Sequence, residues 1–260
     1  MKISEQKLRE SFRCGELKSE LPIFIYKSTH STNDEARAFI ENNDAERAIF
    51  IAEEQTGGRG RLGRKFISER GGLYMSLLLK LDTDLGSAVA ITAYTAVVVR
   101  QAIEELTGIY AKIKWVNDIV IGGKKLSGIL TEGILSADTG RLKYAVIGIG
   151  INALGKAVNT EIAEIATTLE MLGAPISPIS LAARVTELFY SNLNILGTPE
   201  CAEEYRRHSS LIGKDVTVIK KCESYPATVL GISDRCELIL KLDDGREELL
   251  STGEVSVRVK

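Results

Sequence analysis

The chain has 260 residues, of which 44% are hydrophobic and 26% are charged, and its formal net charge is -2. This composition is ordinary for a globular protein and excludes disorder as the main state of the chain. The small net charge gives the molecule as a whole no attraction for nucleic acid or for an anionic membrane, so any anion binding must come from a local cluster.

Predicted helices and strands alternate in the first hundred residues. In chain order these are a helix at 4–12, a strand at 21–26, a helix opened by the capping-type residues 31–34, strands at 47–52 and 72–81, and a long helix at 87–106. A loop rich in glycine and arginine, residues 55–66, separates the second and third strands. Gly108 is expected to end the long helix.

The next hundred residues predict strands first and helices afterwards. The strands are expected at 111–115, 118–121, 126–135 and 142–151, and the helices at 179–196 and 199–208. Tight turns at residues 122–123 and 138–140 join neighbouring strands, which indicates a largely antiparallel sheet. We therefore expect residues 1–209 to form an α/β domain with a mixed, mainly antiparallel sheet.

The pattern changes after Leu211, because no helical periodicity remains. Short alternating strands are expected at 216–220, 225–232, 237–242, 247–251 and 255–259. The pair Asp244–Gly245 is a strong hairpin signal between two of them. Five short strands are typical of a small barrel, so residues 210–260 are expected to form a separate β-barrel domain.

The cysteines and the N-terminus indicate a cytoplasmic protein. The chain has two histidines and four cysteines, with no pair of cysteines at CxxC spacing, so we expect reduced structural thiols and no structural metal site; the cysteines are Cys14, Cys201, Cys222 and Cys236. The charged, amphipathic start of the chain lacks the apolar core of a signal peptide. No stretch approaches the roughly 20 apolar residues that a membrane span needs.

The loop at residues 57–64, with the sequence GGRGRLGR, carries the strongest chemical signal. Glycines let the backbone approach a ligand closely, and arginine forks match phosphate and carboxylate oxygens. The loop lacks the Gly-Lys-Ser/Thr ending of a P-loop, and it precedes a strand where a dinucleotide fingerprint would open a helix. It also occurs once, unlike an Arg-Gly RNA-binding tail. A solvated loop without function is the remaining alternative.

Three further clusters contain candidate ligand-binding residues. In residues 112–118 (KIKWVND), alternation puts the two lysines on one face of a strand and places Asn117 and Asp118 at its end. In residues 124–132, a lysine enters a strand and Gly128 leaves room for a flat ligand. In residues 148–152 (GIGIN), glycines alternate along one face and form a trench suited to a planar ring. Each cluster taken singly also has a structural explanation. Residues 112–118 could be an edge strand that ends in an Asx turn, and the lysine of 124–132 could be a solvated hairpin residue. The glycines of 148–152 could allow a helix to pack closely on the strand.

Together and in this order, the clusters resemble those of the biotin–protein ligase family, also called biotin–[acetyl-CoA-carboxylase] ligase. The matching segments are residues 31–33 (STN), Gln55 with 58–64 (GRGRLGR), 114–118 (KWVND), 125–130 (KLSGIL) and 148–152 (GIGIN). The resemblance covers nearly the whole chain, because the C-terminal strands are similar to the family's small SH3-like domain. It implies a catalytic domain related to class II aminoacyl-tRNA synthetases and to lipoate ligases.

The resemblance implies an enzyme that activates biotin with MgATP to biotinoyl-5′-adenylate. The enzyme then transfers biotin to a lysine of a biotin carboxyl carrier protein, such as that of acetyl-CoA carboxylase. The residues implied to bind biotin are Ser31, Thr32, Asn33, Gln55, Arg59, Gly60, Arg61, Lys125 and Gly128. Those implied to bind ATP or the adenylate are Arg61, Arg64, Phe66, Lys114, Asn117, Lys125 and Asn152. Lys125 and Arg61 are the implied catalytic residues, and Asp118 is a candidate base for the second step.

The sequence departs from the family's usual motif at two positions. Phe66 stands where the family commonly has a tryptophan that packs on adenine, and Val116 replaces a frequent proline. Phenylalanine still stacks, although it lacks an indole N–H. Neither change removes a charged group, so we expect activity to be retained.

Some members of the family also repress transcription through an N-terminal helix-turn-helix domain. Here the residues before Leu21 predict one short helix, which is too little for a three-helix DNA reader, so we expect a form without DNA or membrane partners. A homodimer is left open, because the family often pairs through a sheet edge. Two other functions are left open as well: a lipoate or octanoate ligase on the same fold, and a non-catalytic nucleic-acid or carrier-binding module.

Overall fold

The computed structural model of the protein describes residues 3–13, 15–84, 86–155, 164–220, 223–251 and 254–257. In these residues the α-helices are α1 (Glu5–Ser11), α2 (Gly15–Glu20), α3 (Thr32–Asn42), α4 (Ser87–Thr107), α6 (Pro178–Ser191) and α7 (Pro199–Arg207). Two 3-10 turns are η1 (Arg61–Gly63) and η2 (Leu193–Ile195). The strands of the larger sheet are β1 (Ile23–Tyr26), β2 (Arg47–Ala52), β3 (Leu73–Thr83), β4 (Lys112–Lys114), β5 (Asp118–Ile121), β6 (Lys124–Leu135) and β7 (Leu142–Ile151).

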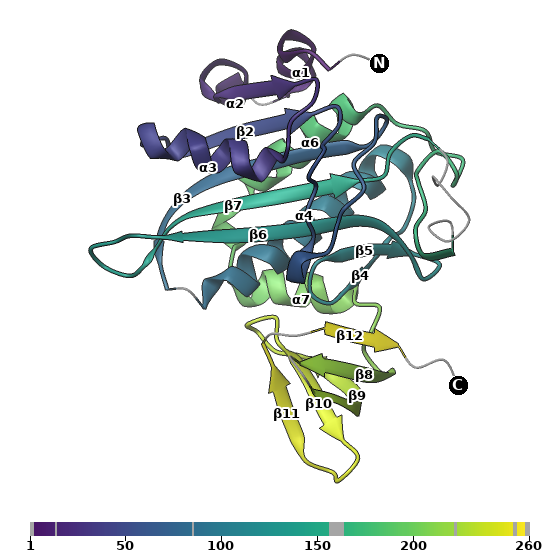
Figure 1. The fold of residues 1–260 in the computed structure, drawn as a ribbon. Coiled ribbons are helices and arrows are strands. Elements are labelled where there is room, and N and C mark those ends of the chain that lie inside the picture. The colour runs from purple at the N-terminus through teal and green to yellow at the C-terminus, as the bar shows by residue number, and fades with distance from the viewer. Residues whose placement is uncertain are drawn as a thin grey trace.

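The larger sheet has seven strands in the order β1-β2-β3-β7-β6-β5-β4 (Figure 1). Strand β1 runs parallel to β2, and every other neighbouring pair is antiparallel. Gly122 and Gly123 both have positive φ in the turn between β5 and β6, which glycine adopts at no steric cost. The predicted mixed, mainly antiparallel sheet is therefore confirmed.

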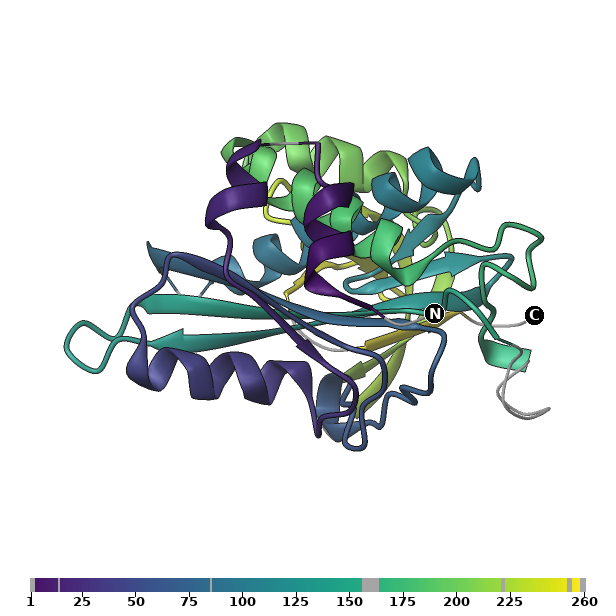
Figure 2. The ribbon, with the colours of Figure 1, turned by 90° about the horizontal axis from the view of Figure 1, so that it is seen from above.

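Helices cover both faces of this sheet (Figure 2). Helices α4 and α6 lie on one face, and α3 lies on the other. The alternation of side chains along β2 serves both layers: Ile49 and Ile51 belong to the larger core under α4 and α6, whereas Ala48 and Phe50 belong to the smaller core under α3. In that smaller core the rings of Phe24 and Phe50 stack with centroids 4.9 Å apart.

A second sheet follows α7 in the chain. Its strands β8 (Asp215–Lys220), β9 (Glu223–Ile232), β10 (Leu238–Leu242), β11 (Glu247–Leu250) and β12 (Glu254–Val257) are antiparallel in the order β11-β10-β9-β8-β12. This confirms the predicted C-terminal β segment. The proposed domain boundary between residues 209 and 210 falls between α7 and β8.

Hydrogen bonds connect the segment of the second sheet to the larger domain. The indole N–H of Trp115, in the turn between β4 and β5, donates to the carbonyl oxygen of Cys236 at 2.8 Å. The guanidinium of Arg206 on α7 donates to the carbonyl oxygen of Ile232 at 3.0 Å. Both indole and carbonyl are buried, so the contact ties the turn that precedes Asn117 to the C-terminal sheet.

Two predictions about helices were wrong in part. The helix expected over 179–196 ends at Ser191, and η2 follows as a separate turn, because Asn192 leaves the helical region at φ -111° and ψ 21°. Helix α2 was not predicted. It has six residues and only Leu17 of them is buried, which leaves no apolar periodicity to recognise.

Two of the cysteines lie inside the described residues, and both are buried free thiols. Burial raises the pKa of Cys201 to about 11 and that of Cys236 to about 12. Because the thiolate is the reactive form, we expect neither to be alkylated by iodoacetamide at pH 8 in the native protein. Both should be alkylated in denaturant, as peptide mapping by mass spectrometry would reveal. Native labelling at either position would contradict this burial. Cys14 and Cys222 lie outside the described residues.

None of the helices that the structure describes has both the length and the apolar character of a membrane span.

Candidate functional site

A cavity of about 800 Å³ opens on the face of the larger sheet. Its lining comes from several segments, namely the start of α3, the glycine-arginine loop and the residues that lead from it into β3, the β4–β5 turn, strands β6 and β7, and residues 164–168. The lining includes every residue that the sequence predicted for the site, namely Ser31, Thr32, Asn33, Gln55, Arg59, Gly60, Arg61, Arg64, Phe66, Lys114, Asn117, Asp118, Lys125, Gly128 and Asn152. The fold thus brings together segments that are far apart in the sequence.

Glycines form the floor of the cavity. Gly128 on β6 lies opposite Gly150 on β7, so neither of these neighbouring strands has a side chain at this position. The ring of Phe66 lies on this spot: a Cβ at Gly150 would come within 2.4 Å of the ring, and a Cβ at Gly128 within 3.3 Å. The trench was predicted to take a planar ring, and the ring that it takes here is the protein's own Phe66.

Gly148 has a different neighbour from Gly150. A Cβ at Gly148 would come within 2.5 Å of the side-chain oxygen of Asn33, at the start of α3. Close packing of a helix on bare strand was the alternative explanation for this glycine motif. It holds for Gly148, whereas the close neighbour of Gly150 is Phe66; both glycines line the cavity.

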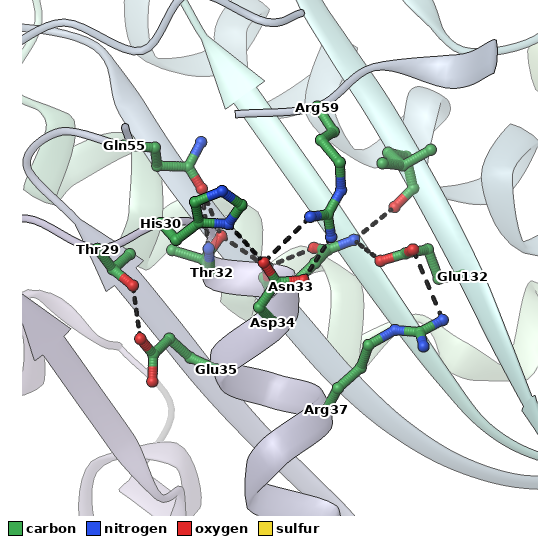
Figure 3. Close-up of polar contacts among 12 residues, drawn as sticks. Thr29, His30, Thr32, Asn33, Asp34, Glu35, Arg37, Gln55, Arg59 and Glu132 are labelled. Atoms are coloured by element: carbon green, nitrogen blue, oxygen red, sulfur yellow. Dashed lines mark hydrogen bonds and ion pairs between the residues drawn. The ribbon is translucent and has the colours of Figure 1, made fainter. Parts of the chain in front are cut away.

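At one end of the cavity, polar side chains are held in place by hydrogen bonds to one another (Figure 3). The side-chain oxygen of Gln55 accepts from the backbone N–H of Thr32 at 2.9 Å and from its hydroxyl at 3.2 Å. The amide of Gln55 donates to Ser68 Oγ at 2.9 Å. These bonds fix which way the Gln55 amide points.

Asn33 is oriented by residues on two strands, β3 and β6. Its amide nitrogen donates to the Glu132 carboxylate at 2.7 Å, and its oxygen accepts from the hydroxyl of Ser76 at 2.6 Å. The Ser76 hydroxyl also lies 2.7 Å from that of Thr32. Ser76, Glu132 and Ser68 were missed in the sequence. The sequence signal for Ser76 was a polar residue inside the otherwise apolar run of β3. The serine is fully buried, and buried hydroxyls are normally hydrogen-bonded.

The opposite end of the cavity is cationic. The Lys125 ammonium is 2.7 Å from a carboxylate oxygen of Asp118 and 5.8 Å from the centroid of the Phe66 ring. Arg61 in the loop donates to the side-chain oxygen of Asn117 at 3.2 Å, and Asn117 donates in turn to the carbonyl of Ile129 at 2.9 Å. The pairing leaves Asp118 engaged with a cation in this structure.

Asn152 and Arg59 point to protein groups in this structure. The amide of Asn152 donates to the carbonyl oxygen of Thr167 at 3.1 Å. The guanidinium of Arg59 forms two contacts with the Asp34 carboxylate, one of them at 3.0 Å (Figure 3). The hydrogen bonds from Arg59 are the largest cause of the lowered pKa of Asp34.

A cavity with a hydrogen-bonding array at one end, cations at the other and glycines between them suits an elongated ligand with a polar head and an anionic tail. The comparisons with known proteins agree with that chemistry. A family model described as "Biotin/lipoate A/B protein ligase family" matches residues 22–152, and one described as "Biotin protein ligase C terminal domain" matches residues 211–258.

Curated relatives and solved structures extend over most of the chain. It is 32% identical over 258 residues to the bifunctional ligase/repressor BirA of Bacillus subtilis, covering 96% of this chain and 78% of that one. It is 27% identical over 247 residues to the biotin–[acetyl-CoA-carboxylase] ligase of Mycobacterium tuberculosis, covering 89% and 87%. The structure of Aquifex aeolicus biotin protein ligase in complex with biotin and ATP aligns with a TM-score of 0.78 at 28% identity, covering 92% and 99%.

The fold and the cavity thus define a ligase catalytic domain joined to a small β domain, and the chain belongs to the biotin/lipoate A/B protein ligase family. The C-terminal match and the relatives group it with the biotin protein ligases within that family.

Proposed function

We propose that this enzyme activates biotin with ATP and transfers it to a lysine of a biotin carboxyl carrier protein. The observation that carries the proposal is that one cavity holds two complementary ends. The Thr32–Gln55 array suits the cyclic urea of biotin, which offers one acceptor and two donors. Lys125 and Arg61 at the other end suit a carboxylate that meets a phosphate.

In the first step a carboxylate oxygen of biotin attacks the α-phosphorus of ATP. The bond from that phosphorus to the bridging oxygen breaks, and pyrophosphate leaves with the bonding electrons. No protein nucleophile is required, so the enzyme contributes position and charge. Lys125 stabilises the negative charge that builds up on the α-phosphate, and Arg61 closes over the product.

Magnesium enters this proposal as part of the substrate MgATP. The described residues contain no group of three or more His, Cys, Asp or Glu side chains that could hold a metal ion. Magnesium commonly binds through substrate phosphates and one or two carboxylates, and Asp118 is a carboxylate at the phosphate end of the cavity. Mg²⁺ neutralises phosphate charge when it arrives with ATP.

In the second step the neutral amine of the carrier lysine attacks the acyl carbon of the adenylate. An amide bond forms, the mixed anhydride breaks, and AMP leaves. The amine must also lose a proton, and we propose Asp118 as its acceptor. Because Asp118 pairs with Lys125 here, this role requires the pair to separate when the carrier binds.

The proposal is tested by incubating the protein with biotin, MgATP and a carrier domain, followed by a streptavidin blot. Label on the carrier that depends on ATP is the expected result. A competent carrier that stays unlabelled would overturn the proposal. Lipoate transfer in place of biotin would assign the alternative ligase activity, and tight biotin binding by calorimetry would exclude a nucleic-acid or carrier-binding module.

Gly150 provides a test of the cavity floor. Gly150→Ala is expected to push the Phe66 ring off the floor, since its Cβ would lie 2.4 Å from a ring carbon. If Phe66 stacks on adenine, as the family resemblance implies, the KM for ATP should rise about tenfold, the equivalent of about 1.4 kcal/mol. Gly86→Ala is the matched control, because its Cβ would meet no atom within 4 Å. Equal KM values for both variants would contradict the stacking role.

A further inference from the structure

Asp34 lies just outside the residues assigned to the site, and it contacts the loop that closes over the ligand (Figure 3). We propose that Asp34 is a positioning residue. It clamps Arg59 and so divides the glycine-arginine loop into a fixed first part, residues 55–59, and a movable second part, residues 60–64. The clamp is inferred from the contacts between Asp34 and Arg59, whereas its effect on biotin binding rests on the proposed function.

The loop begins against the segment that precedes α3. The backbone N–H of Thr56 donates to the carbonyl of Thr29 at 2.9 Å, and that of Gly57 donates to the carbonyl of His30 at 2.8 Å. Gly57 lies so close to the imidazole of His30 that a Cβ there would come within 2.1 Å of the ring. No larger residue fits at position 57 unless the His30 ring moves, so backbone contacts fix the entry to the loop.

The Asp34 carboxylate extends this attachment by two residues. Both of its oxygens contact the Arg59 guanidinium, and one oxygen lies 2.9 Å from Nδ1 of His30. The side chains of Arg59 and Asp34 are 36% and 39% exposed, so the pair is partly withdrawn from solvent. Asp34 also lies in the first turn of α3, where the helix dipole favours a negative charge. A carboxylate held by a helix, an imidazole and a two-pronged guanidinium is a rigid anchor.

The loop changes character after Arg59. Residues 61–63 form the single turn η1, in which Leu62 has a φ of 55° and is 74% exposed. A leucine at positive φ with its side chain in solvent belongs to a segment held by few packing contacts. The second part meets the β4–β5 turn across the cavity through Arg61 and Asn117. The backbone N–H of Gly60 donates to the carbonyl oxygen of Arg64 at 2.7 Å, which closes residues 60–64 into a turn, and exposure begins inside this turn at Leu62. The boundary between the clamped part of the loop and this turn therefore lies at Gly60.

This division has a consequence for the site. Gln55 and the backbone of residues 56–59 can form the wall around the polar end of the ligand before any ligand arrives. Only residues 60–64 then have to move for ATP to enter and for the adenylate to be covered. A preformed wall reduces the ordering cost of binding, so the clamp should strengthen biotin binding more than it speeds the chemical step.

Limited trypsin digestion without ligand tests the clamp directly, because Arg59, Arg61 and Arg64 are all cleavage sites. In the wild-type protein we expect cleavage after Arg61 and Arg64 and protection after Arg59. Asp34→Asn keeps the shape and removes the charge. It should raise the rate of cleavage after Arg59 about tenfold, because cleavage of an opened segment follows its open population. Mass spectrometry assigns each cut.

Two further variants make the result decisive. Asp34→Glu keeps a carboxylate and should restore the protection. Asp44→Asn removes a carboxylate paired with Lys80 at 2.7 Å, beyond the C-terminal end of α3, and should leave the pattern unchanged. Equal cleavage after Arg59 in wild type and Asp34→Asn, at equal Tm, would overturn the clamp. In a carrier-labelling assay, Asp34→Asn should raise the KM for biotin and leave kcat near the wild-type value. Failure of the proposed function would instead appear as no biotin dependence at all, with Arg59 still protected.

Discussion

Replacing Lys125 with alanine is expected to reduce the rate of adenylate formation by about 10²–10³, the usual effect of removing one preorganised donor from a developing oxyanion. The ammonium of Lys125 lies at the cationic end of the cavity, beside Asp118 and 5.8 Å from the Phe66 ring centroid. Its loss also leaves the Asp118 carboxylate without its counter-ion, which adds repulsion toward the phosphates of ATP. Pyrophosphate release with biotin and ATP, without a carrier, measures this step alone.

Lys124→Ala is the matched control for Lys125→Ala. The two lysines are neighbours on β6 and point to opposite faces, and Lys125 is the one that lines the cavity. We expect Lys124→Ala to keep pyrophosphate release near the wild-type rate. A Lys125→Ala variant that transferred purified biotinoyl-adenylate normally would place its role in the first step. Unchanged pyrophosphate release in Lys125→Ala would refute the assignment.

Replacing Arg61 with alanine is expected to release the activated intermediate into solution. The side chain of Arg61 bridges from the loop to Asn117 on the opposite wall, at 3.2 Å. Without this bond the second part of the loop loses a contact that keeps it closed, and the mixed anhydride escapes before the carrier arrives. Labelling of an added bystander protein should rise about tenfold, in line with the loss of one charge-assisted hydrogen bond.

Leu62→Ala separates this effect from general loosening of the loop. Leu62 lies in the same turn, and its side chain is exposed, so its truncation removes little packing. We expect carrier and bystander labelling by Leu62→Ala to match those of the wild type. If Arg61→Ala labels bystanders no more than Leu62→Ala does, Arg61 does not retain the adenylate.

Local patterns predicted much of the fold. The apolar runs at 47–52 and 142–151 are strands β2 and β7 with the predicted bounds, and Gly108 ends α4 in the left-handed conformation. These features depend on residues that are neighbours in the sequence, so the hydrophobic periodicity and the residues that terminate helices are sufficient to predict them. The end of α6 at Ser191 was mispredicted, because apolar residues continue beyond the helix into η2.

The partners of the site residues could not be predicted in the same way. Glu132 meets Asn33, Ser76 meets Thr32, and Asp34 meets Arg59 across different elements. Each of these pairs is separated by 25 or more positions in the sequence, so no local pattern contains it. The residues of the five motifs lie in the cavity lining, which also contains Tyr74, Met75 and residues 164–168 from outside the motifs. The folded chain determines which of the motif residues are held by protein groups.

The hydrogen bond between Trp115 and Cys236 gives the protein a built-in optical probe. Trp115 is the one tryptophan in the sequence, so all tryptophan emission comes from this indole. It is buried, its N–H is bonded to the C-terminal sheet, and Asn117 of the cavity follows two residues later. A shift in emission wavelength therefore reports separation of the two sheets and ligand-induced change at the cavity wall, with no label attached.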